Sequence, residues 1–363
     1  MPLTSVHLEY SRKRPSLLVA PLMCMLLFAL PARASDASPC ASRIDPNAPQ
    51  AVLANDSLQA IVYLPDAQRG YYRGSRFDWS GVIGCLAYKG HTYFGIWFPH
   101  YDPLLHDAIT GPVEEFRSAG GDSAPFYEDA LPNGVFVKPG IGVLKKTGDA
   151  PFQFSAQYPI VDHGKWAVHA HRDNIVFQQK LKPRAGAGYS YTKTLRLDSG
   201  EPVLSIEHTL TNTGTRTIDT EVYEHNFYML DDAPTGPAIS VHFPFEPAAA
   251  KDLGNGAQIA GRKIVFNREL QTRESAFAAL TGFSQNVSDY DFTVENSATG
   301  AGVEQTADMP IARMFFWSIR TTVCPEAYIH LVVAPGQTVR WTIRYRFFTT
   351  SSASSQTPAA AHR

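Results

Sequence analysis

Residues 202–232 read PVLSIEHTLTNTGTRTIDTEVYEHNFYMLDD, and this stretch decides the fold. In residues 203–210, apolar and polar side chains alternate at nearly the period of two that marks a half-buried strand. Asn212 and Gly214 then favour a reversal of the chain, because Asn can hydrogen-bond its own backbone and Gly can adopt positive φ. A second alternating run ends at His225. The stretch therefore predicts a hairpin whose second strand carries His225 on its polar face.

Strand-like sequence recurs along most of the chain, and Gly, Pro, Asn or Asp bounds each run. The runs before and after the first stretch are residues 166–171, 175–181, 189–197, 238–245, 263–266, 277–283, 290–294, 313–319 and 339–348. No amphipathic helix longer than a few turns, no solenoid repeat and no phosphate loop interrupts them. The chain therefore predicts an all-β fold, a large antiparallel two-sheet sandwich that occupies residues 50–349 as one domain.

Composition and charge narrow the possible partners. The chain has 363 residues, of which 44% are hydrophobic, and this is ample for a large core. The formal net charge is −2, and no long basic run interleaved with aromatic residues appears beyond residues 11–14. These features argue against a nucleic-acid partner.

Residues 1–34 have the three parts of a secretory signal. Residues 11–14 are basic, residues 17–30 are mostly apolar, and Ala32-Arg33-Ala34 is a small-x-small cleavage site. The apolar run is shorter than the roughly twenty residues that a membrane span needs. We therefore expect cleavage after Ala34, a periplasmic or secreted mature protein without a transmembrane segment, and a linker at residues 35–49. Residues 350–363 are rich in small and polar residues and predict a disordered tail.

The mature chain would keep Cys40, Cys85 and Cys324. An exported compartment permits one disulfide among them, and the sequence does not choose the pair. Cys85 lies among apolar residues, which also fits a small buried side chain without a bridge. No Cys or His pair has the spacing of a zinc site, so no zinc site is expected.

An aromatic, basic loop at residues 70–79 has the residue types of a sugar site. Trp79 can stack on the C–H face of a sugar, while Arg76 and Asp78 can bind hydroxyl groups. The alternative is an ordinary loop whose Phe77 and Trp79 pack into the sandwich edge. A second loop carries polar side chains that could line a cleft, bind a metal or simply face solvent. Its members are His100, Asp102, His106, Asp107, Glu114 and Glu115.

Two motifs carry a resemblance to a known family. The order of strand, N-x-G turn, strand and then His225, two aromatics and an Asp resembles the aldose 1-epimerase (galactose mutarotase) superfamily. Residues 322–338 contain Val-Cys-Pro-Glu and then a Pro-Gly turn, which resembles the hexose-6-phosphate mutarotase branch. Each motif alone also has a simpler explanation, namely a packed imidazole at His225 and a solvated carboxylate at Glu326.

The resemblance implies a galactose mutarotase-like supersandwich and a catalytic role for both residues. Glu326 would take the proton of the anomeric hydroxyl while His225 protonates the ring oxygen, so that the ring opens and closes on the other face. The partner would be a mono- or oligosaccharide, and the two groups need no cofactor. We expect Asp232, at the end of the first motif, among the substrate-binding residues together with Arg76, Asp78, Trp79, Trp97 and Lys138.

One departure from the family pattern keeps other functions open. Asn133-Gly134 stands where the family has a His-Gly pair, so Lys138 or His163 would have to orient the substrate. A non-catalytic carbohydrate-binding module of the same fold would use Arg76, Trp79 and Trp97 as its platform. A polysaccharide lyase or hydrolase is the third possibility, and the polar loop at residues 100–115 could serve it.

Overall fold

The two strands of the first stretch lie in two different sheets. The computed structural model describes residues 39–40 and 45–350. Strand β12 (Val203–Asn212) pairs with β11 (Ala187–Leu197) and β23 (Thr338–Thr349), whereas β13 (Ile218–His225) belongs to the other large sheet. The predicted hairpin is therefore wrong in its pairing, because the connection crosses from one sheet to the other.

The side chain of Asn212 helps to hold the turn at this crossing. Its Nδ2 donates hydrogen bonds to the carbonyl oxygens of Arg216 (2.7 Å) and Val333 (2.8 Å), and its Oδ1 accepts one from the Gly214 backbone N–H (2.9 Å). Together with backbone bonds from Thr213 and Thr215 to the neighbouring 186–188 segment, this side chain closes the turn and ties it to the end of β22. Cross-strand hydrogen bonds between β12 and β13 are not needed to hold the reversal.

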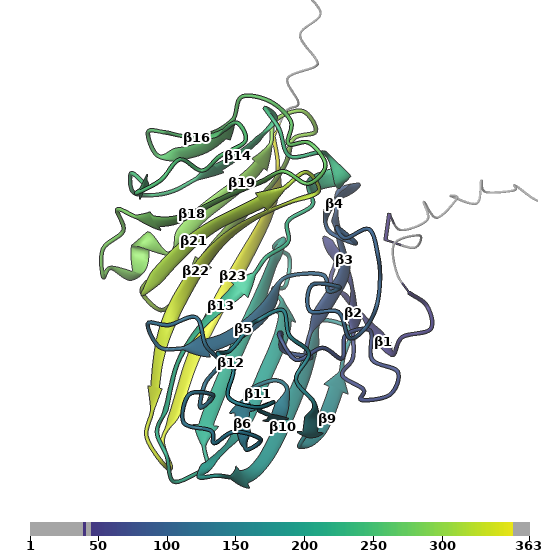
Figure 1. Cartoon of the computed structure of the whole chain (residues 1–363). Coiled ribbons are helices and arrows are strands. Elements are labelled where there is room, and N and C mark those ends of the chain that lie inside the picture. Colours follow the sequence, from purple (N-terminus) through teal and green to yellow (C-terminus); the bar gives the residue numbers. More distant parts are fainter. Residues whose placement is uncertain (1–38, 41–44, 351–363) are drawn as a thin grey trace, which may run out of the picture. The chain divides into compact units, whose positions relative to one another are not determined.

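The larger sheet has ten antiparallel strands, of which β23, β12, β11 and β10 (Asn174–Arg184) lie side by side. Its other strands are β16 (Ala257–Ala260), β17 (Lys263–Phe266), β14 (Ile239–His242), β19 (Asp291–Asn296), β20 (Ala301–Ala307) and β9 (Lys165–Ala170). In Figure 1, β23, β12, β11 and β10 run behind β13 of the second sheet.

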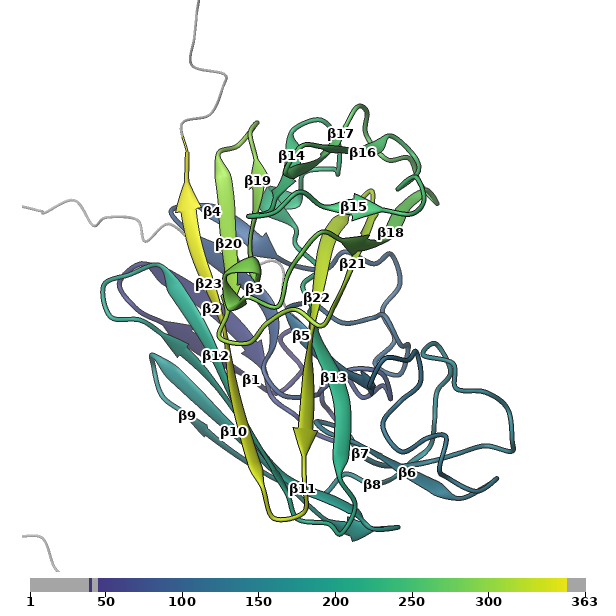
Figure 2. The ribbon, with the colours of Figure 1, turned by 90° about the vertical axis from the view of Figure 1, so that its left-hand side faces the viewer.

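The second large sheet has six strands in the order β15-β18-β21-β22-β13-β5. Besides β13, they are β15 (Ala248–Ala249), β18 (Ser275–Thr281), β21 (Arg313–Ile319), β22 (Thr322–Val333) and β5 (Val113–Ser118). Figure 2 shows β22 and β23, which follow each other in the chain, in separate layers. The expected antiparallel two-sheet architecture is confirmed.

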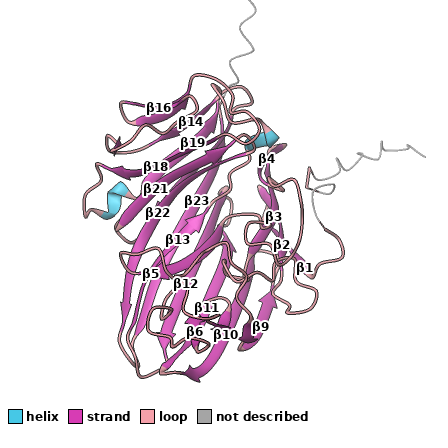
Figure 3. Ribbon diagram, viewed as in Figure 1, coloured by secondary structure: helices cyan, strands magenta, loops and turns pink. Residues whose placement is uncertain are grey.

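Two small sheets and two short helices complete the described part of the chain, and strands dominate it (Figure 3). The small sheets contain β1 (Gln50–Ala54), β2 (Leu58–Tyr63), β3 (Val82–Tyr88) and β4 (His91–Phe94), and β6 (Val135–Lys138), β7 (Gly142–Lys145) and β8 (Ile160–Asp162). The 3₁₀ helices are η1 (Leu230–Asp232) and η2 (Val287–Asp289). Among the described residues, no helix is long and apolar enough to cross a membrane. The expected signal and residues 351–363 of the expected tail lie outside the described residues.

Two large apolar clusters make up most of the core, and a small third one surrounds Cys40 and Cys85. One fills the space between the large sheets and includes Ile206, Val222 and Ile343. The other is rich in aromatic residues and includes Phe77, Trp97 and Phe227, so it packs beneath the loops that precede and follow the small sheets. The second cluster supports the residues described in the next subsection.

The structure resolves the open cysteine pairing. Cys40 and Cys85 form a disulfide, and Cys324 is a buried free thiol. The bridge fixes the start of the described chain to β3.

Replacing both bridged cysteines by serine should lower the free energy of unfolding by about 4 kcal/mol. The two residues are 45 positions apart, and a loop of that length loses this much chain entropy when it is cross-linked. Urea unfolding of the double variant and the wild type measures the difference. A reducing agent should weaken the wild type alone, and equal stabilities of the two proteins would contradict a stabilising bridge.

Candidate active site

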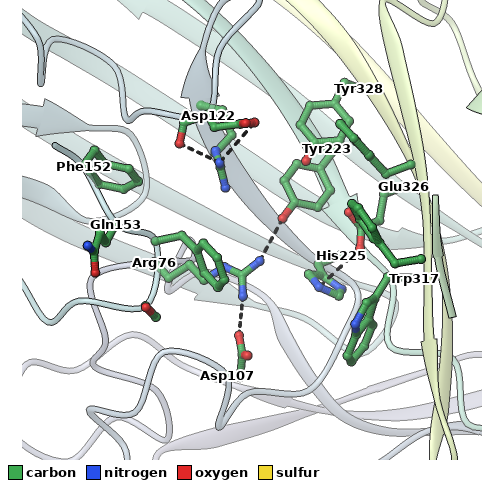
Figure 4. A pocket seen from close by; sticks show the side chains of 15 residues that line it. Arg76, Asp107, Asp122, Phe152, Gln153, Tyr223, His225, Trp317, Glu326 and Tyr328 are labelled. Atoms are coloured by element: carbon green, nitrogen blue, oxygen red, sulfur yellow. Dashed lines mark hydrogen bonds and ion pairs between the residues drawn. The ribbon is translucent and has the colours of Figure 1, made fainter. Parts of the chain in front are cut away.

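The register of three neighbouring strands brings His225 and Glu326 together. On β13 and β22 Tyr223 lies opposite Tyr328, and on β21 and β22 Phe315 lies opposite Glu326. Side chains alternate along each strand, so His225 and Glu326 point to the same outer face, away from the space between the sheets. His225 Nε2 lies 3.4 Å from Glu326 Oε1 (Figure 4).

The ladder between β13 and β22 breaks beside this pair, and Asn226 bridges the break. Asn226 Nδ2 donates to the carbonyl oxygen of Pro325 (2.8 Å), and its Oδ1 accepts from the Tyr345 hydroxyl (3.0 Å). Gly111 packs against the same backbone, where a Cβ atom would lie 2.2 Å from the Asn226 carbonyl oxygen. These contacts fix the end of β13 and hence the position of His225.

The pair lies in a cavity of about 560 Å³, a size typical of small-molecule sites. The floor comes from β13, β21 and β22, and loop residues 152–155 form a wall. Aromatic and charged side chains share the lining, which consists of Arg76, Asp107, Arg117, Asp122, Phe152, Gln153, Phe154, Ser155, Tyr223, His225, Phe277, Phe315, Trp317, Glu326 and Tyr328. The arrangement can hold a ligand that has both apolar faces and hydroxyl groups.

His225 is held by aromatic rings. Its imidazole stacks on Phe227 with ring centroids 3.8 Å apart, and the rings of Phe77 and Trp317 meet it edge-on. Burial, and then the charge of Arg76, lowers the pKa of His225 to about 3. Its Nδ1 is buried and has no hydrogen-bond partner among the described residues. The imidazole is therefore neutral at pH 7 and can accept a proton.

Glu326 has the opposite character. Burial raises its pKa to about 8, and the nearby charge of Arg76 only partly offsets this effect. At neutral pH the carboxyl group therefore keeps its proton. One proton donor and one proton acceptor thus face each other 3.4 Å apart, which is the pairing that acid–base catalysis requires.

Arg76 is the third functional side chain in the cavity. Its Nε donates to Glu115 Oε2 (2.9 Å), its Nη2 donates to the Tyr223 hydroxyl (3.2 Å), and its Nη1 contacts Asp107. The phenyl ring of Phe154 lies over the guanidinium at 4.4 Å. The guanidinium is therefore rigidly placed beside His225, in a position to bind sugar hydroxyl groups.

Glu115 anchors this cationic side of the cavity from below. Its carboxylate forms ion pairs with Arg76 (2.9 Å), Arg117 (3.1 Å) and Lys138 (3.5 Å). Burial alone would raise the pKa of Glu115, but the three cations hold it well below its usual range. The Tyr223 hydroxyl donates a further hydrogen bond to Oε2 at 2.6 Å. Glu115 is thus a fixed negative charge that positions Arg76.

The expected site residues lie in different places. Arg76, His225 and Glu326 line the cavity, while Lys138 lies behind it and donates to the Arg76 carbonyl oxygen (2.5 Å). Trp97 is buried, stacks on Phe227 with ring centroids 4.6 Å apart, and donates to the Ile109 carbonyl oxygen. It supports His225 through Phe227 and does not line the cavity.

The other expected residues are farther from the cavity. Asp78 is buried and accepts hydrogen bonds from Ser80, and Trp79 donates to the Gly74 carbonyl oxygen and packs against His163. Asp232 is exposed in η1. Asn133 is exposed in a turn with positive φ, and neither it nor His163 lines the cavity. Among the residues that do line it, His225 is the sole imidazole.

Several lining residues were missed from the sequence. Tyr223 and Tyr328 lie two positions from His225 and Glu326, so the period of two was a usable signal for both. Trp317 lines the cavity because β21 pairs with β22 in a register that the sequence does not reveal. Asp107 was part of the polar loop, but Phe152 and Phe154 belong to a loop with no periodic pattern.

A second buried polar cluster joins the two large sheets. Glu114 on β5, His208 on β12 and Glu224 on β13 offer ligand atoms within 4.8 Å of one another, a spacing that a metal ion could use. Lys193 on β11 already contacts Glu114 and lies 3.7 Å from Asp78. Burial and the charge of Glu114 raise the pKa of Glu224, so that Glu224 keeps its proton. The ammonium of Lys193 therefore serves as the cation of this cluster, which links the sheets.

Known structures share the fold at low sequence identity. No family model matches the chain, and no curated protein sequence matches it. The Slr1438 protein from Synechocystis sp. PCC 6803 has a similar structure, with a TM-score of 0.51, 14% identity, and coverage of 84% of this chain and 96% of that chain. This likeness shows a shared fold.

Two further solved structures have slightly lower TM-scores against this chain. They are a galactose mutarotase related enzyme from Lactobacillus acidophilus (TM-score 0.49, 11% identity, 84% of this chain and 99% of that chain) and the GalM/aldose epimerase homologue from C. elegans (TM-score 0.49, 13% identity, 83% of this chain and 100% of that chain).

Replacing Glu326 by Gln should stabilise the protein, and the gain should grow with pH. The raised pKa of Glu326 means that the folded chain keeps a proton that the unfolded chain loses above its ordinary pKa of 4.5. The stability that the protonated Glu326 side chain contributes is fully present below pH 4.5. It is lost as the pH rises to about 8, by roughly 1.4 kcal/mol per pH unit. Urea unfolding across this range measures the effect.

Glu207→Gln, on the exposed face of β12, is the matched control and should show no such slope. A stability difference between Glu326→Gln and the wild type that stays constant from pH 4.5 to 8 would contradict the raised pKa.

Proposed function

We propose that this protein is an exported carbohydrate-active enzyme that interconverts the anomers of a sugar by acid–base ring opening, as aldose 1-epimerases do. One observation carries the proposal: the side chains of Glu326 and His225 lie 3.4 Å apart at the floor of a cavity with aromatic walls. The sequence motifs around both residues, which resemble that superfamily, support it.

The electrostatics of the pair favours one direction of proton transfer. Glu326 holds the proton in the free site and donates it to the ring oxygen, while His225 accepts the proton of the anomeric hydroxyl. The bond between C1 and the ring oxygen breaks as the aldehyde forms. These roles are the reverse of those that the family resemblance implies, because burial raises the pKa of Glu326 and lowers that of His225.

Ring closure returns both protons. The open chain rotates about its C1–C2 bond, His225 gives its proton back to the carbonyl oxygen, and Glu326 takes the proton of the attacking hydroxyl group. The pair thus ends each turnover as it began. Arg76 orients the hydroxyl groups of the sugar during this step, because Glu115 and Tyr223 hold its guanidinium donors at fixed positions.

A glycoside hydrolase is the second candidate, and one observation favours it. Asp107 also lines the cavity, and although burial raises its pKa, Arg76 and His106 hold it below the usual range. An ionised Asp107 opposite a protonated Glu326 has the charge pattern of a glycosidase. Both oxygens of Asp107 are occupied, however, Oδ1 by Arg76 and Oδ2 by His106. Asp107 therefore holds the guanidinium of Arg76 in place. Release of new reducing ends from an oligosaccharide would favour the hydrolase.

The variants His225→Ala and Glu326→Gln should each slow anomer exchange by about a hundredfold to ten-thousandfold, because each removes one partner of the proton transfer. Exchange NMR or polarimetry on a panel of free aldoses measures the rate above the buffer background. The controls are His330→Ala and Glu207→Gln, which replace exposed residues on β22 and β12. Wild-type protein that binds sugar without speeding exchange would instead support a carbohydrate-binding module.

The catalysed rate should fall above about pH 8, where Glu326 loses its proton, and below about pH 3, where His225 gains one. Either direction of transfer gives this profile, since the pair shares one proton. The ¹⁵N NMR spectrum of His225 separates the two cases. It should show a neutral imidazole at pH 6, and an imidazolium signal there would reverse the assigned roles.

Export is supported by the tripartite sequence of residues 1–34 and by the Cys40–Cys85 disulfide, since such bridges persist in oxidising compartments. The mature protein should begin near Ser35. N-terminal sequencing of protein recovered from the periplasm or medium tests this, and an intact Met1 on protein confined to the cytosol would refute it.

A further inference from the structure

Aromatic side chains continue outward from the catalytic pair across two strands. Trp317 and Phe315 lie two positions apart on β21, and Phe277 on β18 lies opposite Trp317. We call these three residues the aromatic track. Trp317 meets His225 edge-on at 5.5 Å, and Phe315 lies opposite Glu326 in the pairing of β21 with β22. The track therefore begins at the reacting groups and leads toward the edge of the six-stranded sheet.

The far end of the track is open to solvent. Phe277 is 54% exposed, and its ring stacks on Phe315 with centroids 5.8 Å apart and planes 11° apart. The outward neighbours of Phe277 on β18, Ser275 and Ala279, are small and exposed, so they do not cover it. Single exposed apolar residues are common, but these two stacked rings are continuous with the lining of the cavity.

Charged groups border the track on one side. The guanidinium of Arg313 lies 4.5 Å from the ring centroid of Tyr328, and it contacts Glu221 (2.8 Å) and Asp122 (3.3 Å). The side chain of Asp122 is 85% exposed. Aromatic faces beside charged hydrogen-bonding groups match a sugar ring, which has C–H faces and a rim of hydroxyl groups.

We propose that the substrate is a reducing saccharide of at least two residues, with its reducing end at His225 and Glu326 and the next residue stacked on Phe315 and Phe277. This inference rests on the proposed function and names its substrate class. The cavity of about 560 Å³ has the size of a drug-like ligand's site, which is larger than a single hexose needs.

The chemistry limits how the second residue is attached. Ring opening needs a free anomeric hydroxyl at the residue between His225 and Glu326. The next residue must therefore be linked through another hydroxyl group of that sugar, so non-reducing disaccharides are not substrates. The track accepts the added residue by stacking, which makes few demands on the identity of that residue.

The first test compares glucose and galactose with the reducing disaccharides maltose, cellobiose and lactose. The wild type should exchange the anomers of at least one disaccharide with a higher kcat/KM than its own reducing-end monosaccharide. Phe277→Ala and Phe315→Ala should lower this ratio by about tenfold, mainly through KM, because the stacked residue loses its platform. Val332→Ala, an exposed apolar residue on β22 outside the cavity, should leave the ratio unchanged.

The second test measures binding without turnover, so that it does not depend on the proposed activity. Calorimetry on Glu326→Gln should show tighter binding of that disaccharide than of its monosaccharide, and adding Phe277→Ala should remove the difference. If this holds while the wild type never speeds anomer exchange, the substrate class stands and the proposed activity fails. Equal affinities for both sugars would overturn the inference. A dimer that Phe277→Ala dissociates without changing sugar binding would also overturn it, because the track would then hold two copies of the chain together.

Discussion

The antiparallel pairing of β13 with β22 is the constraint on which the site depends. It sets Tyr223 opposite Tyr328 and, two positions on, brings His225 Nε2 to 3.4 Å from Glu326 Oε1. A slip of one residue would turn each side chain of β13 to the other face, because the side-chain period of a strand is two. Glu224 would then leave the cluster that contains Lys193, and His225 would enter the core. The packing between the sheets therefore protects the register that the outer face needs.

Two glutamates on that outer face show how one environment yields two kinds of carboxyl group. Glu115 and Glu326 are both buried, and burial alone raises the pKa of each. Glu115 contacts Arg76, Arg117 and Lys138, so it is ionised, whereas Glu326 has the neutral imidazole of His225 as its neighbour and keeps its proton. Burying the carboxyl group of Glu326 costs stability, but it also keeps that group protonated at neutral pH. The proposed chemistry uses this proton.

Periodicity was enough to predict the all-β architecture from the sequence. Two short motifs selected His225 and Glu326, and the residue types of the loop at 70–79 selected Arg76; the structure brings all three into one cavity. The sequence did not reveal which strands pair. The stretch around Asn212 has every local sign of a hairpin, yet its two strands lie in different sheets because long-range pairing decides the outcome. For the same reason Trp97 and Trp79, which have the composition of a sugar platform, are packing residues, while Trp317 and Phe315 reach the cavity through the register of β21.

A crystal structure of Glu326→Gln with a bound reducing disaccharide would test the central claim most directly. The account predicts that the anomeric hydroxyl and the ring oxygen of the reducing-end residue lie within about 2.6–3.2 Å of the imidazole of His225 and the amide at position 326. The second residue should lie over Phe315 and Phe277. A sugar bound with its anomeric carbon away from both side chains, or with its non-reducing end between them, would contradict the account.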